Sequence, residues 1–387
     1  MRILMVEHTG KGGMYAYTDA LCGGLCKNGE DITVLTSSAW PELARPFNIE
    51  RHMLNFPDNH SQWSKLHWAA DRIGRSLCNS YRRNRFAVRK NYDVIHIQGA
   101  GTPLLDQLFL KPLAKQLPLV LTVHDIKSHY ERFVSKDSFL KRSLQIPHRL
   151  IVHYEQGKRQ LVDNWGLCSD HIDVIPHGIM PMHNPPECSD ARKKLNLPRD
   201  RRILLFFGGI RPNKGLDILL EALEIVRLYD PGILLVVAGN LHRGMSFEPY
   251  TNIIKRLNLS QHVQTFVHFI AEENVDYFFA ASDLVVLPYL KFEAQSGVLL
   301  RAYAHKKPVV VSNVGAMGNL VSSDKVGLVI KPGDPESLAE AIISVLDNPN
   351  KFQSRYSPEL INKYSFKHIA ELTMNSYKKV IASRNSS

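Results

Sequence analysis

The sequence predicts an α/β protein of two successive doubly wound domains, each a parallel sheet with helices on both faces. Short apolar runs bounded by Gly, Pro, Asn or Asp alternate with amphipathic segments, which is the pattern of repeated strand–helix–strand units. The alternation runs through the first half of the chain and starts again near residue 203. A length of 387 residues is too great for one ordinary domain and suits two.

In the first half, six apolar runs predict buried strands and two segments predict helices. The N-terminal run MRILMV passes directly into glycines, so we expect a first strand there and not a signal peptide. The expected strands are residues 2–6, 31–35, 94–98, 119–123, 149–152 and 173–175, and the expected helices are residues 15–27 and 106–116.

The second half repeats the pattern after a proline-containing segment, residues 178–198, whose composition predicts an exposed linker. The helix expected first has apolar residues at helical spacing from Leu216 to Val226. The expected strands are residues 203–207, 233–238, 263–269, 284–287 and 308–312, and the expected helices are residues 215–229, 250–257, 275–281, 297–304 and 335–346.

Composition narrows the partners and the compartment. Lys and Arg total 48 against 37 Asp and Glu, a formal net charge of +11, which favours anionic partners such as nucleotides, phosphates, anionic lipids or nucleic acid. The five cysteines are odd in number and scattered, so a reducing compartment is favoured over a disulfide framework. No apolar stretch reaches bilayer length, so we expect a cytoplasmic protein, with peripheral contact at the inner face of the membrane left open.

Loops that follow strands are the candidate ligand-binding segments, because ligands of open α/β sheets bind at the carboxyl ends of strands. The first such loop carries Gly10, Gly12 and Gly13, and glycines there let backbone amides approach an anion. Its G-K-G-G spacing is not the dinucleotide fingerprint, and no acidic residue closes the second strand, so NAD binding is disfavoured. A plain tight turn is the alternative interpretation.

Two loops of the second half carry groups that suit the binding of a phosphate or diphosphate. Residues 207–215 combine Gly208 and Gly209 with Arg211 and Lys214, a planar fork of donors and a mobile point charge. An exposed basic turn is the alternative.

The other loop, residues 287–297, ends in Ser296, which is a suitable helix N-cap. Free amides near Ser296, Gly297 and Val298 would meet a phosphate, and Glu293 stands just before them, where a carboxylate would hold sugar hydroxyls or a developing positive charge. Simple capping of the helix is the alternative.

Histidines stand at the ends of three expected strands. His124 is followed by Asp125 after residues 119–123, a placement that suits a catalytic pair. His96 and His177 occupy similar positions, and a lone His is more often structural. His124 is therefore the preferred catalytic candidate of the three.

Taken together, these segments resemble the GT-B fold retaining glycosyltransferases of family 4 (glycosyl transferases group 1) over nearly the whole chain. The carriers are Gly12-Gly13, the segments YDVIH (92–96), TVHD (122–125) and VIPHG (174–178), the loop 207–215 with the helix after it, and the segments AASDLVVLP (280–288), 293–304 and KPVVV (307–311). Residues 364–381 are similar to the family's final helix, which crosses back onto the first domain. The resemblance implies two Rossmann-like domains facing a central cleft, with residues 1–180 as acceptor domain, 199–363 as nucleotide-sugar domain and 364–387 as the returning helix.

The resemblance also implies an activity. Such enzymes transfer a hexose from a nucleotide diphospho-sugar, here a UDP- or GDP-sugar, to an acceptor with retention of the anomeric configuration. The acceptor would be a glycan or lipid-linked saccharide in the biosynthesis of a cell-surface polysaccharide such as lipopolysaccharide. No cofactor or metal is implied, and no D-x-D-type metal pair is seen.

Each site residue takes a role from this resemblance. Arg211 and Lys214 would neutralise the leaving diphosphate, Glu293 would contact the donor sugar, and His124 would lie near the sugar and acceptor. Backbone amides would add to the anion site, from the loop of Gly12 and Gly13, from Gly209 and from Ser296, Gly297 and Val298.

Arg301 departs from the family pattern, because the second acid of the E-x7-E motif falls at this position. An Arg cannot accept the hydrogen bonds of ribose hydroxyls. It would pair with Glu293 or bind phosphate instead. The alternative to an enzyme is therefore a catalytically inactive GT-B scaffold or binding protein. The family's usual Arg is also replaced by Gly209, and Arg211 would substitute for it.

Residues 72–90 form a basic segment with interleaved aromatic and apolar residues. This mixture suits contact with an anionic membrane, and a solvated helix face is the alternative. A nucleic-acid-binding protein is a third hypothesis for the charge. We expect no nucleic-acid partner, because no nucleic-acid motif appears and anionic substrates explain the basic residues.

Overall fold

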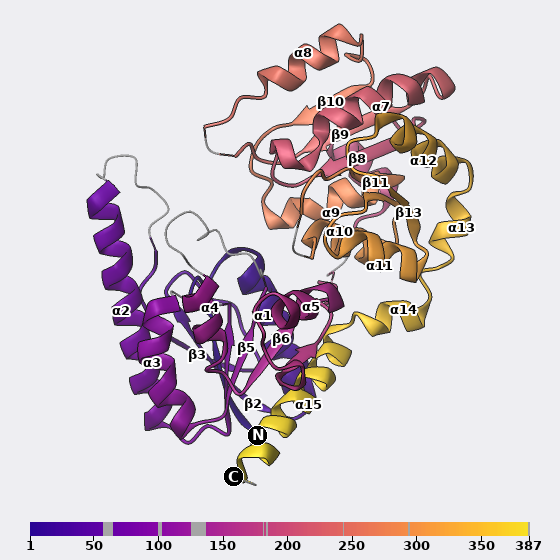
Figure 1. Cartoon of the computed structure of the whole chain (residues 1–387). Coiled ribbons are helices and arrows are strands. Elements are labelled where there is room, and N and C mark those ends of the chain that lie inside the picture. The colour runs from indigo at the N-terminus through magenta and orange to yellow at the C-terminus, as the bar shows by residue number, and fades with distance from the viewer. Residues whose placement is uncertain are drawn as a thin grey trace. The chain divides into compact units, whose positions relative to one another are not determined.

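The chain forms two compact units in a computed structural model that describes residues 1–56, 65–99, 103–124, 137–180, 182, 185–242, 244–292 and 295–385. Unit 1 consists of Met1–Met180 together with Lys363–Ser387, and unit 2 of Pro181–Asn362 (Figure 1). Each unit carries its own parallel sheet, which confirms the predicted fold class.

Unit 1 is built on a seven-stranded parallel sheet with the order β3-β2-β1-β4-β5-β6-β7. Successive residues of β1 face two different cores: Ile3 and Met5 belong to one apolar cluster, Leu4 and Val6 to the other. A strand buried on both faces reads as a continuous apolar run, which is why it was predictable. The strands are β1 (Arg2–Val6), β2 (Asp31–Ser37), β3 (Asn48–Met53), β4 (Val94–Gln98), β5 (Leu119–Thr122), β6 (Arg149–Val152) and β7 (Ile172–Val174).

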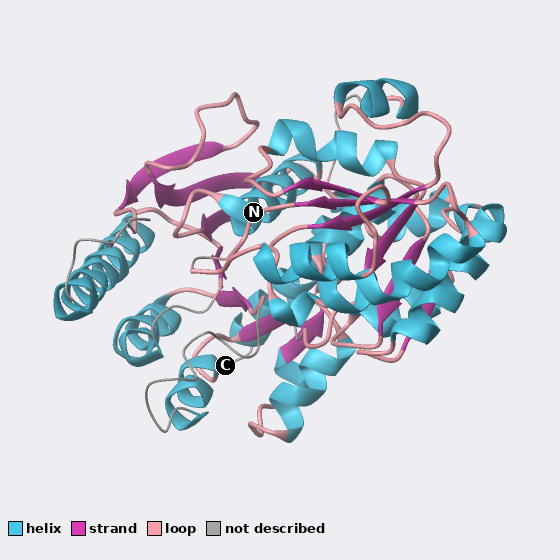
Figure 2. Cartoon of the chain, turned by 90° about the horizontal axis from the view of Figure 1, so that it is seen from above, coloured by secondary structure: helices cyan, strands magenta, loops and turns pink. Residues whose placement is uncertain are grey.

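Helices cover both faces of this sheet (Figure 2). On one face, α1 (Gly12–Lys27) lies beside the C-terminal helix α15 (Phe366–Asn385), and a Cβ on Gly24 would come within 2.4 Å of the Phe366 carbonyl oxygen. The predicted return of the last helix onto the first domain is thereby confirmed. The remaining helices are α2 (Lys65–Arg89), α3 (Pro103–Gln116), α4 (Asp137–Leu144), α5 (Glu155–Asp163) and the 3-10 turn η1 (Ser169–His171).

Unit 2 has a six-stranded parallel sheet with the order β10-β9-β8-β11-β12-β13. Its strands are β8 (Ile203–Phe207), β9 (Leu234–Ala238), β10 (Val263–Phe266), β11 (Leu284–Leu287), β12 (Val309–Ser312) and β13 (Gly327–Ile330). Its helices are α6 (Cys188–Lys194), η2 (Pro212–Lys214), α7 (Leu216–Tyr229), α8 (Glu248–Arg256), α9 (Glu272–Ala281), α10 (Gly297–Ala304), α11 (Met317–Asp324), α12 (Pro335–Asp347), α13 (Pro349–Gln353) and α14 (Pro358–Lys363).

The expected linker over residues 178–198 is wrong in its second half. Residues 188–194 form α6, and Arg192 is buried against unit 2, where its Nε donates to the Ala281 carbonyl and its Nη2 pairs with Asp283 at 2.9 Å. The prolines of this segment therefore border a helix that belongs to unit 2. Within the described residues, no helix has both the length and the apolar character needed to cross a bilayer.

Candidate functional site

Both sheets reverse their strand order at one point, and the candidate residues gather there. In unit 1 the reversal lies between β1 and β4, and in unit 2 between β8 and β11. Loops that leave neighbouring strands in opposite directions open a crevice at the carboxyl ends, where ligands of such sheets bind. The glycine loops at residues 7–13 and 208–215 follow β1 and β8, so each stands at the reversal point of its own sheet.

In unit 2 the loops after β8 and β11 are tied to each other. Gly215 has φ +68°, and a Cβ there would lie 2.1 Å from the Pro288 carbonyl oxygen, so only glycine fits. The Asn213 carbonyl accepts from the Leu290 amide at 2.9 Å, and the Asn213 side-chain amide donates to the Lys291 carbonyl at 3.1 Å. These contacts hold the basic loop at residues 211–214 against the loop that begins at residue 288.

Lys214 lies in a cage of aromatic rings. Its ammonium nitrogen is 3.5 Å from the ring centre of Tyr289 and 4.1 Å from that of Phe292. Burial, assisted by the neighbouring Arg211 charge, lowers the pKa of Lys214 to about 7. Cation–π contact compensates part of the lost hydration. An anion placed beside Lys214 would restore its charge, because an opposite charge raises the pKa of an ammonium.

The helix α10 presents its first turn to the same loops. Ser296 is its N-cap and accepts from the Leu299 amide at 3.4 Å, which confirms the predicted cap. A Cβ on Gly297 would meet nothing within 4 Å, so open space adjoins the helix N-terminus. A Cβ on Gly208 would lie 3.3 Å from Val298, so the turn of α10 sits against the glycine loop. The structure thus brings Gly209, Arg211, Lys214, Ser296, Gly297 and Val298 to one end of the unit 2 sheet.

Arg301, in the second turn of α10, pairs with acids of α9. One guanidinium nitrogen forms an ion pair with Glu272 and the other lies 3.5 Å from Asp276. The His305 Nε2 atom donates to the same Asp276 oxygen at 2.8 Å. The His305 hydrogen bond and the Arg301 charge outweigh burial and lower the pKa of Asp276. Glu293, the expected partner of Arg301 and of the donor sugar, lies outside the described residues.

In unit 1 the glycine loop is shaped by a buried carboxylate that the sequence analysis missed. Glu7 accepts from the Thr9 amide at 3.0 Å, the Thr9 hydroxyl at 2.5 Å and the Gly10 amide at 2.6 Å. Gly12 has φ +73°, and a Cβ on Gly12 or Gly13 would meet nothing within 4 Å. The hydrogen bonds of Glu7 therefore fix the start of the loop, and open space adjoins Gly12 and Gly13.

His124 lies in a buried cluster with two other histidines. Its Nε2 is 3.0 Å from Gln98 Oε1, and its Nδ1 is 3.0 Å from His153 Nε2. The Tyr17 ring packs on His124, His153 and His177, with ring centres 4.7 to 5.3 Å apart. Burial and the neighbouring histidines lower the pKa of His124 to about 3. His124 is therefore neutral at physiological pH, with both ring nitrogens engaged, and cannot serve as a cationic acid.

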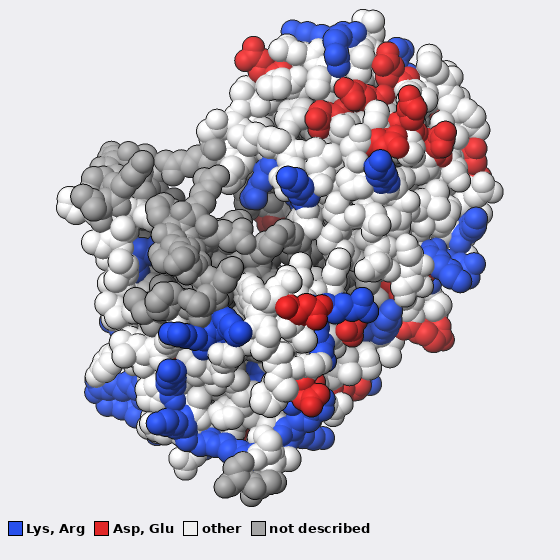
Figure 3. Space-filling view, viewed as in Figure 1, with Lys and Arg blue, Asp and Glu red and all other residues white. Residues whose placement is uncertain are grey.

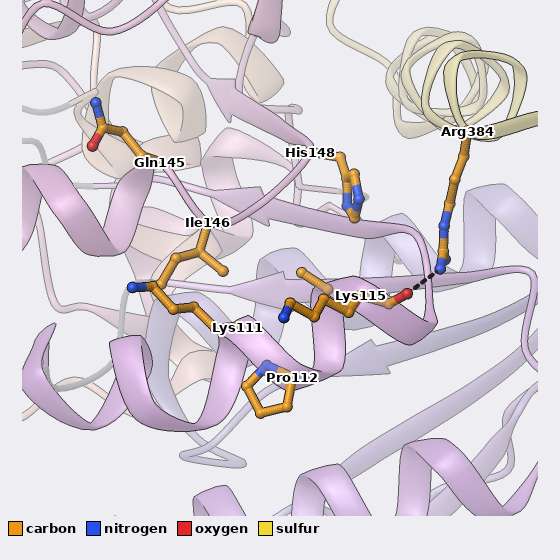
Figure 4. Close-up of a pocket in the computed structure, with 8 residues that line it drawn as sticks. Lys111, Pro112, Lys115, Gln145, Ile146, His148 and Arg384 are labelled. Atoms are coloured by element: carbon orange, nitrogen blue, oxygen red, sulfur yellow. Dashed lines mark hydrogen bonds between the residues drawn. The ribbon is translucent and has the colours of Figure 1, made fainter. Parts of the chain in front are cut away.

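A basic pocket of about 580 Å³ lies in unit 1 at the amino ends of its strands (Figure 4). It is lined by Lys111 and Lys115 of α3, by His148 before β6, and by Arg384 of α15, which donates to the Lys115 carbonyl at 2.5 Å. These residues stand at the amino ends of β5 and β6, away from the loops that follow the strands. Among the described residues, no group of three or more His, Cys, Asp or Glu is placed to hold a metal ion.

Two family models match the chain and between them cover most of it. Glycosyltransferase Family 4 matches residues 11–181, and Glycosyl transferases group 1 matches residues 189–360. The chain belongs to this glycosyltransferase family. The predicted resemblance is confirmed, and this glycosyltransferase has the GT-B fold.

Relatives and solved structures agree with this assignment. A D-inositol 3-phosphate glycosyltransferase of Rhodococcus jostii is 28% identical over 244 residues, 61% of this chain and 54% of the relative, so the chain spans about half the length of that protein. Sucrose-phosphate synthase of Thermosynechococcus elongatus superposes with a TM-score of 0.72 at 20% identity, covering 99% and 100% of the two chains. HepE of Anabaena, solved with UDP, gives 0.67 at 19% identity over 100% of both chains. Similarity at these identities shows the fold.

Proposed function

We propose that this glycosyltransferase transfers a hexose from a UDP- or GDP-sugar to a glycan or lipid-linked saccharide, with retention of configuration and without a metal ion. Unit 2 would bind the donor and unit 1 the acceptor. The observation that carries the proposal is the Lys214 ammonium, held beside Arg211 at the reversal point of the unit 2 sheet. The HepE structures with UDP and UDP-glucose support a nucleotide donor.

Transfer of the sugar requires positive charge beside the diphosphate that leaves the donor. As the bond from the anomeric carbon to the diphosphate oxygen lengthens, negative charge grows on the diphosphate. Groups already oriented toward that charge lower the barrier, since they need no reorganisation during the reaction. Lys214 and Arg211 supply two cations and the first turn of α10 supplies amides, so the protein itself provides the charge that a divalent metal supplies elsewhere.

The experiment is a transfer assay with matched variants. In Lys214→Met we expect transfer to fall at least about 100-fold, the scale of losing one oriented transition-state group. Lys255→Met, which removes an exposed lysine of α8, is the control and should behave as wild type. Chelation by EDTA should leave the rate unchanged, and the anomeric proton of the product should show the donor's configuration. Full transfer by Lys214→Met would overturn the proposed role of unit 2.

The inactive-scaffold alternative rests on Arg301. Its guanidinium is engaged by Glu272 and Asp276, so a cation stands where the family has a carboxylate. The alternative predicts that UDP or GDP binds without any turnover of a nucleotide sugar. A thermal-shift screen with UDP-, GDP-, ADP- and TDP-sugars, followed by measurement of donor hydrolysis and transfer, separates the two. Binding with hydrolysis or transfer supports the enzyme, and binding alone supports the scaffold.

We also propose that α2 docks unit 1 on an anionic membrane at the inner face. Ile73, Leu77 and Tyr81 are exposed at helical spacing on this helix, and no acidic residue occurs in the sequence between Asp71 and Asp93. An amphipathic helix with apolar and basic residues exposed together has the character of an interfacial anchor.

A further inference from the structure

A pocket of about 270 Å³ opens at the reversal point of the unit 1 sheet. His8 and Thr9 line it after β1, and Gln98 and Gly99 line it at the end of β4. Its position is where a doubly wound sheet binds ligands, and its volume suits a small group better than a whole oligosaccharide. All of its lining residues belong to unit 1.

One face of α2 forms the polar wall of this pocket. The wall residues recur at spacings of three and four, which places them along a single stripe of the helix. Asn79 fixes the helix to the chain after β3, because its side-chain amide exchanges two hydrogen bonds with the Leu54 backbone, at 2.7 and 3.0 Å. The wall consists of Arg72, Ser76, Asn79, Ser80 and Arg83.

Arg83 is the unusual member of this wall. It is 1% exposed, its Nε donates to Asn84 Oδ1 at 3.2 Å, and its Nη2 is buried without a hydrogen-bond partner. A guanidinium stays charged in proteins, and a buried charge with an unused donor is costly unless something pairs with it. The nearby Asp106 acts electrostatically on Arg83, yet Nη2 keeps its unused hydrogen.

A second unpaired polar atom belongs to His8, which also lines this pocket. The Nε2 atom of His8 is buried and makes no hydrogen bond. Burial, together with the Arg83 charge, lowers the pKa of His8 to about 4, so the ring is neutral and can donate or accept one hydrogen bond. Two orphaned polar atoms in one pocket point to a polar ligand that satisfies both.

The charges of the pocket residues favour an anionic ligand. Arg72 and Arg83 bring two positive charges, and Asp106 is the one carboxylate among the described lining residues. Arg72 also lies over the rings of Phe56 and Trp68, at 5.6 and 5.3 Å, which orients its guanidinium. An Arg fork matches the geometry of a carboxylate or phosphate.

We infer that this pocket binds an oxyanion, a phosphate or a carboxylate, carried by the acceptor, with Arg83 as its anchor. The inference rests on the proposed function, because it assigns the acceptor to unit 1. Binding would pair the unused Arg83 hydrogen with an anionic oxygen and give His8 its missing partner. Neutral acceptors would leave Arg83 Nη2 buried and unpaired, so the pocket would discriminate against them.

The test compares anionic ligands with neutral analogues of the same skeleton. Glycerol 3-phosphate is compared with glycerol, and glucuronate with glucose, by titration calorimetry on the full chain saturated with UDP. The titrations are repeated without UDP on Lys214→Met with Arg211→Met, so that neither cation of the unit 2 site contributes. We expect at least one anion to bind at least tenfold tighter than its neutral analogue. Tighter binding of glycerol 3-phosphate than of glycerol would identify a phosphate site, and tighter binding of glucuronate than of glucose would identify a carboxylate site.

The decisive variant is Arg83→Met with Asp106→Asn, which removes both buried charges together. We expect the anion to bind at least tenfold more weakly and UDP to bind as in wild type. Lys111→Met with Lys115→Met, which removes two positive charges at the amino ends of the unit 1 strands, is the control and should change neither. If the buried double variant loses its helical circular dichroism, Arg72→Met carries the test, because Arg72 is exposed and its loss should weaken the anion at least threefold.

Two results would overturn the inference: an anion that binds no tighter than its neutral analogue, or anion affinity that survives loss of Arg72 and of Arg83. UDP binding reports on unit 2 separately. Anion binding without UDP binding would contradict the donor site in unit 2 and support the anion pocket in unit 1. UDP binding without anion binding would support the donor site and contradict the anion pocket.

Discussion

Gly297 is a residue whose substitution separates ligand binding from stability. A methyl group there would meet nothing within 4 Å, and the residue does not have a positive φ, so Gly297→Ala should fold with unchanged or slightly higher stability. If a phosphate sits at the N-terminus of α10, the methyl group takes its space, and UDP should bind about tenfold or more weakly, a loss of about 1.4 kcal/mol.

Calorimetry with UDP and a thermal melt of the same sample check this expectation. Gly23→Ala is the matched control, because its methyl group also meets open space but lies on α1 in unit 1. Unchanged UDP affinity in Gly297→Ala would argue against a phosphate at this helix end.

The lowered pKa of Lys214 predicts that UDP binding depends on pH. Its pKa in the free protein is about 7, and a bound diphosphate raises the pKa of an ammonium, so binding above pH 7 takes up a proton. UDP affinity should therefore fall as pH rises from 7 to 8.5, by up to about tenfold per unit. Lys214→Arg keeps its charge throughout and should flatten the profile.

Calorimetry in two buffers of different ionisation enthalpy measures the proton uptake directly. Zero uptake by wild type at pH 8 would contradict the low pKa of Lys214. The same slope in Lys214→Arg would assign the pH dependence to another group.

The helix α15 is bound to the sheet of unit 1 by a buried hydrogen bond. The Tyr377 hydroxyl lies 2.6 Å from His96 Nδ1, and His96 Nε2 lies 2.7 Å from the Thr122 hydroxyl. Tyr377→Phe leaves a buried ring nitrogen without a partner, which should cost about 1–3 kcal/mol of unfolding free energy. Urea unfolding followed by tryptophan fluorescence measures the cost. Tyr229→Phe is the control, since its bond to Asp347 is exposed.

We expect α2 to bind anionic lipid and so to hold unit 1 on the membrane surface. Replacing Ile73, Leu77 and Tyr81 by Ser removes the exposed apolar stripe, and co-sedimentation with phosphatidylglycerol vesicles should fall at least about tenfold, since each buried side chain contributes more than 1 kcal/mol.

The control is a second exposed apolar set, Ile225, Leu228 and Tyr229 of α7, which lies on a helix with Glu221 and Glu224. Its triple Ser variant should bind vesicles as wild type does. Equal losses of vesicle binding in both triple variants would indicate non-specific hydrophobic adsorption and not docking by α2.

Sequence patterns identified all the strands that are buried on both faces and missed two strands that are not, β3 and β13. The strands β1, β8 and β11 are continuous apolar runs, whereas β3 reads NIERHM, a charged and half-exposed edge strand. The strand β13 was also missed, because its short run GLVI gives little periodicity. Tertiary burial of Arg192, which no local pattern reveals, turned an expected linker into part of unit 2.

The candidate site was predictable in unit 2 and less so in unit 1. Loops after strands pointed to Arg211, Lys214 and Ser296, because position after a strand is a local signal. The stripe of Arg72 and Arg83 was hidden, since the same basic segment also carries outward-facing residues, and one-dimensional charge counts do not separate the faces of a helix. His153 was not singled out, and its link to His124 depends on the pairing of β5 with β6.

At the scale of the whole molecule, positive charge is unequally divided. Unit 1 holds 28 Lys and Arg against 18 Asp and Glu, and unit 2 holds 20 against 19. Figure 3 shows Lys and Arg gathered on the visible face of unit 1 and Asp and Glu gathered on part of unit 2. The excess charge therefore lies in the unit proposed for the acceptor, which fits an anionic acceptor or surface.

The buried histidines predict that unit 1 is the acid-sensitive part. His8 and His177 have pKa values of about 4, His96 and His124 of about 3, and burial holds that of His153 well below its usual value. These rings stay neutral in the folded chain but take up protons near pH 6.5 when unfolded. The stability present above pH 6.5 is lost as pH falls toward 4, at up to about 1.4 kcal/mol per pH unit for a single ring.

An acid titration read by two probes checks this. All four tryptophans, at positions 40, 63, 68 and 165, belong to unit 1, so their fluorescence reports on that unit alone. Helical circular dichroism reports on both units, so part of this signal should be lost together with the change in fluorescence, and the remainder, from unit 2, should be lost at a lower pH. Coincident transitions would show that the units unfold together and would contradict separate acid sensitivity.

The interrupted course of unit 1 has a consequence for how the protein is made. Its sheet and α1 are synthesised first, but α15, which completes the apolar cluster that contains Tyr17, Leu21 and Leu25 of α1, follows only after all of unit 2 has been translated. On the ribosome, unit 2 has its full sequence while unit 1 still lacks its last helix. For that interval the nascent chain carries an uncovered apolar strip, which is the kind of surface that chaperones bind.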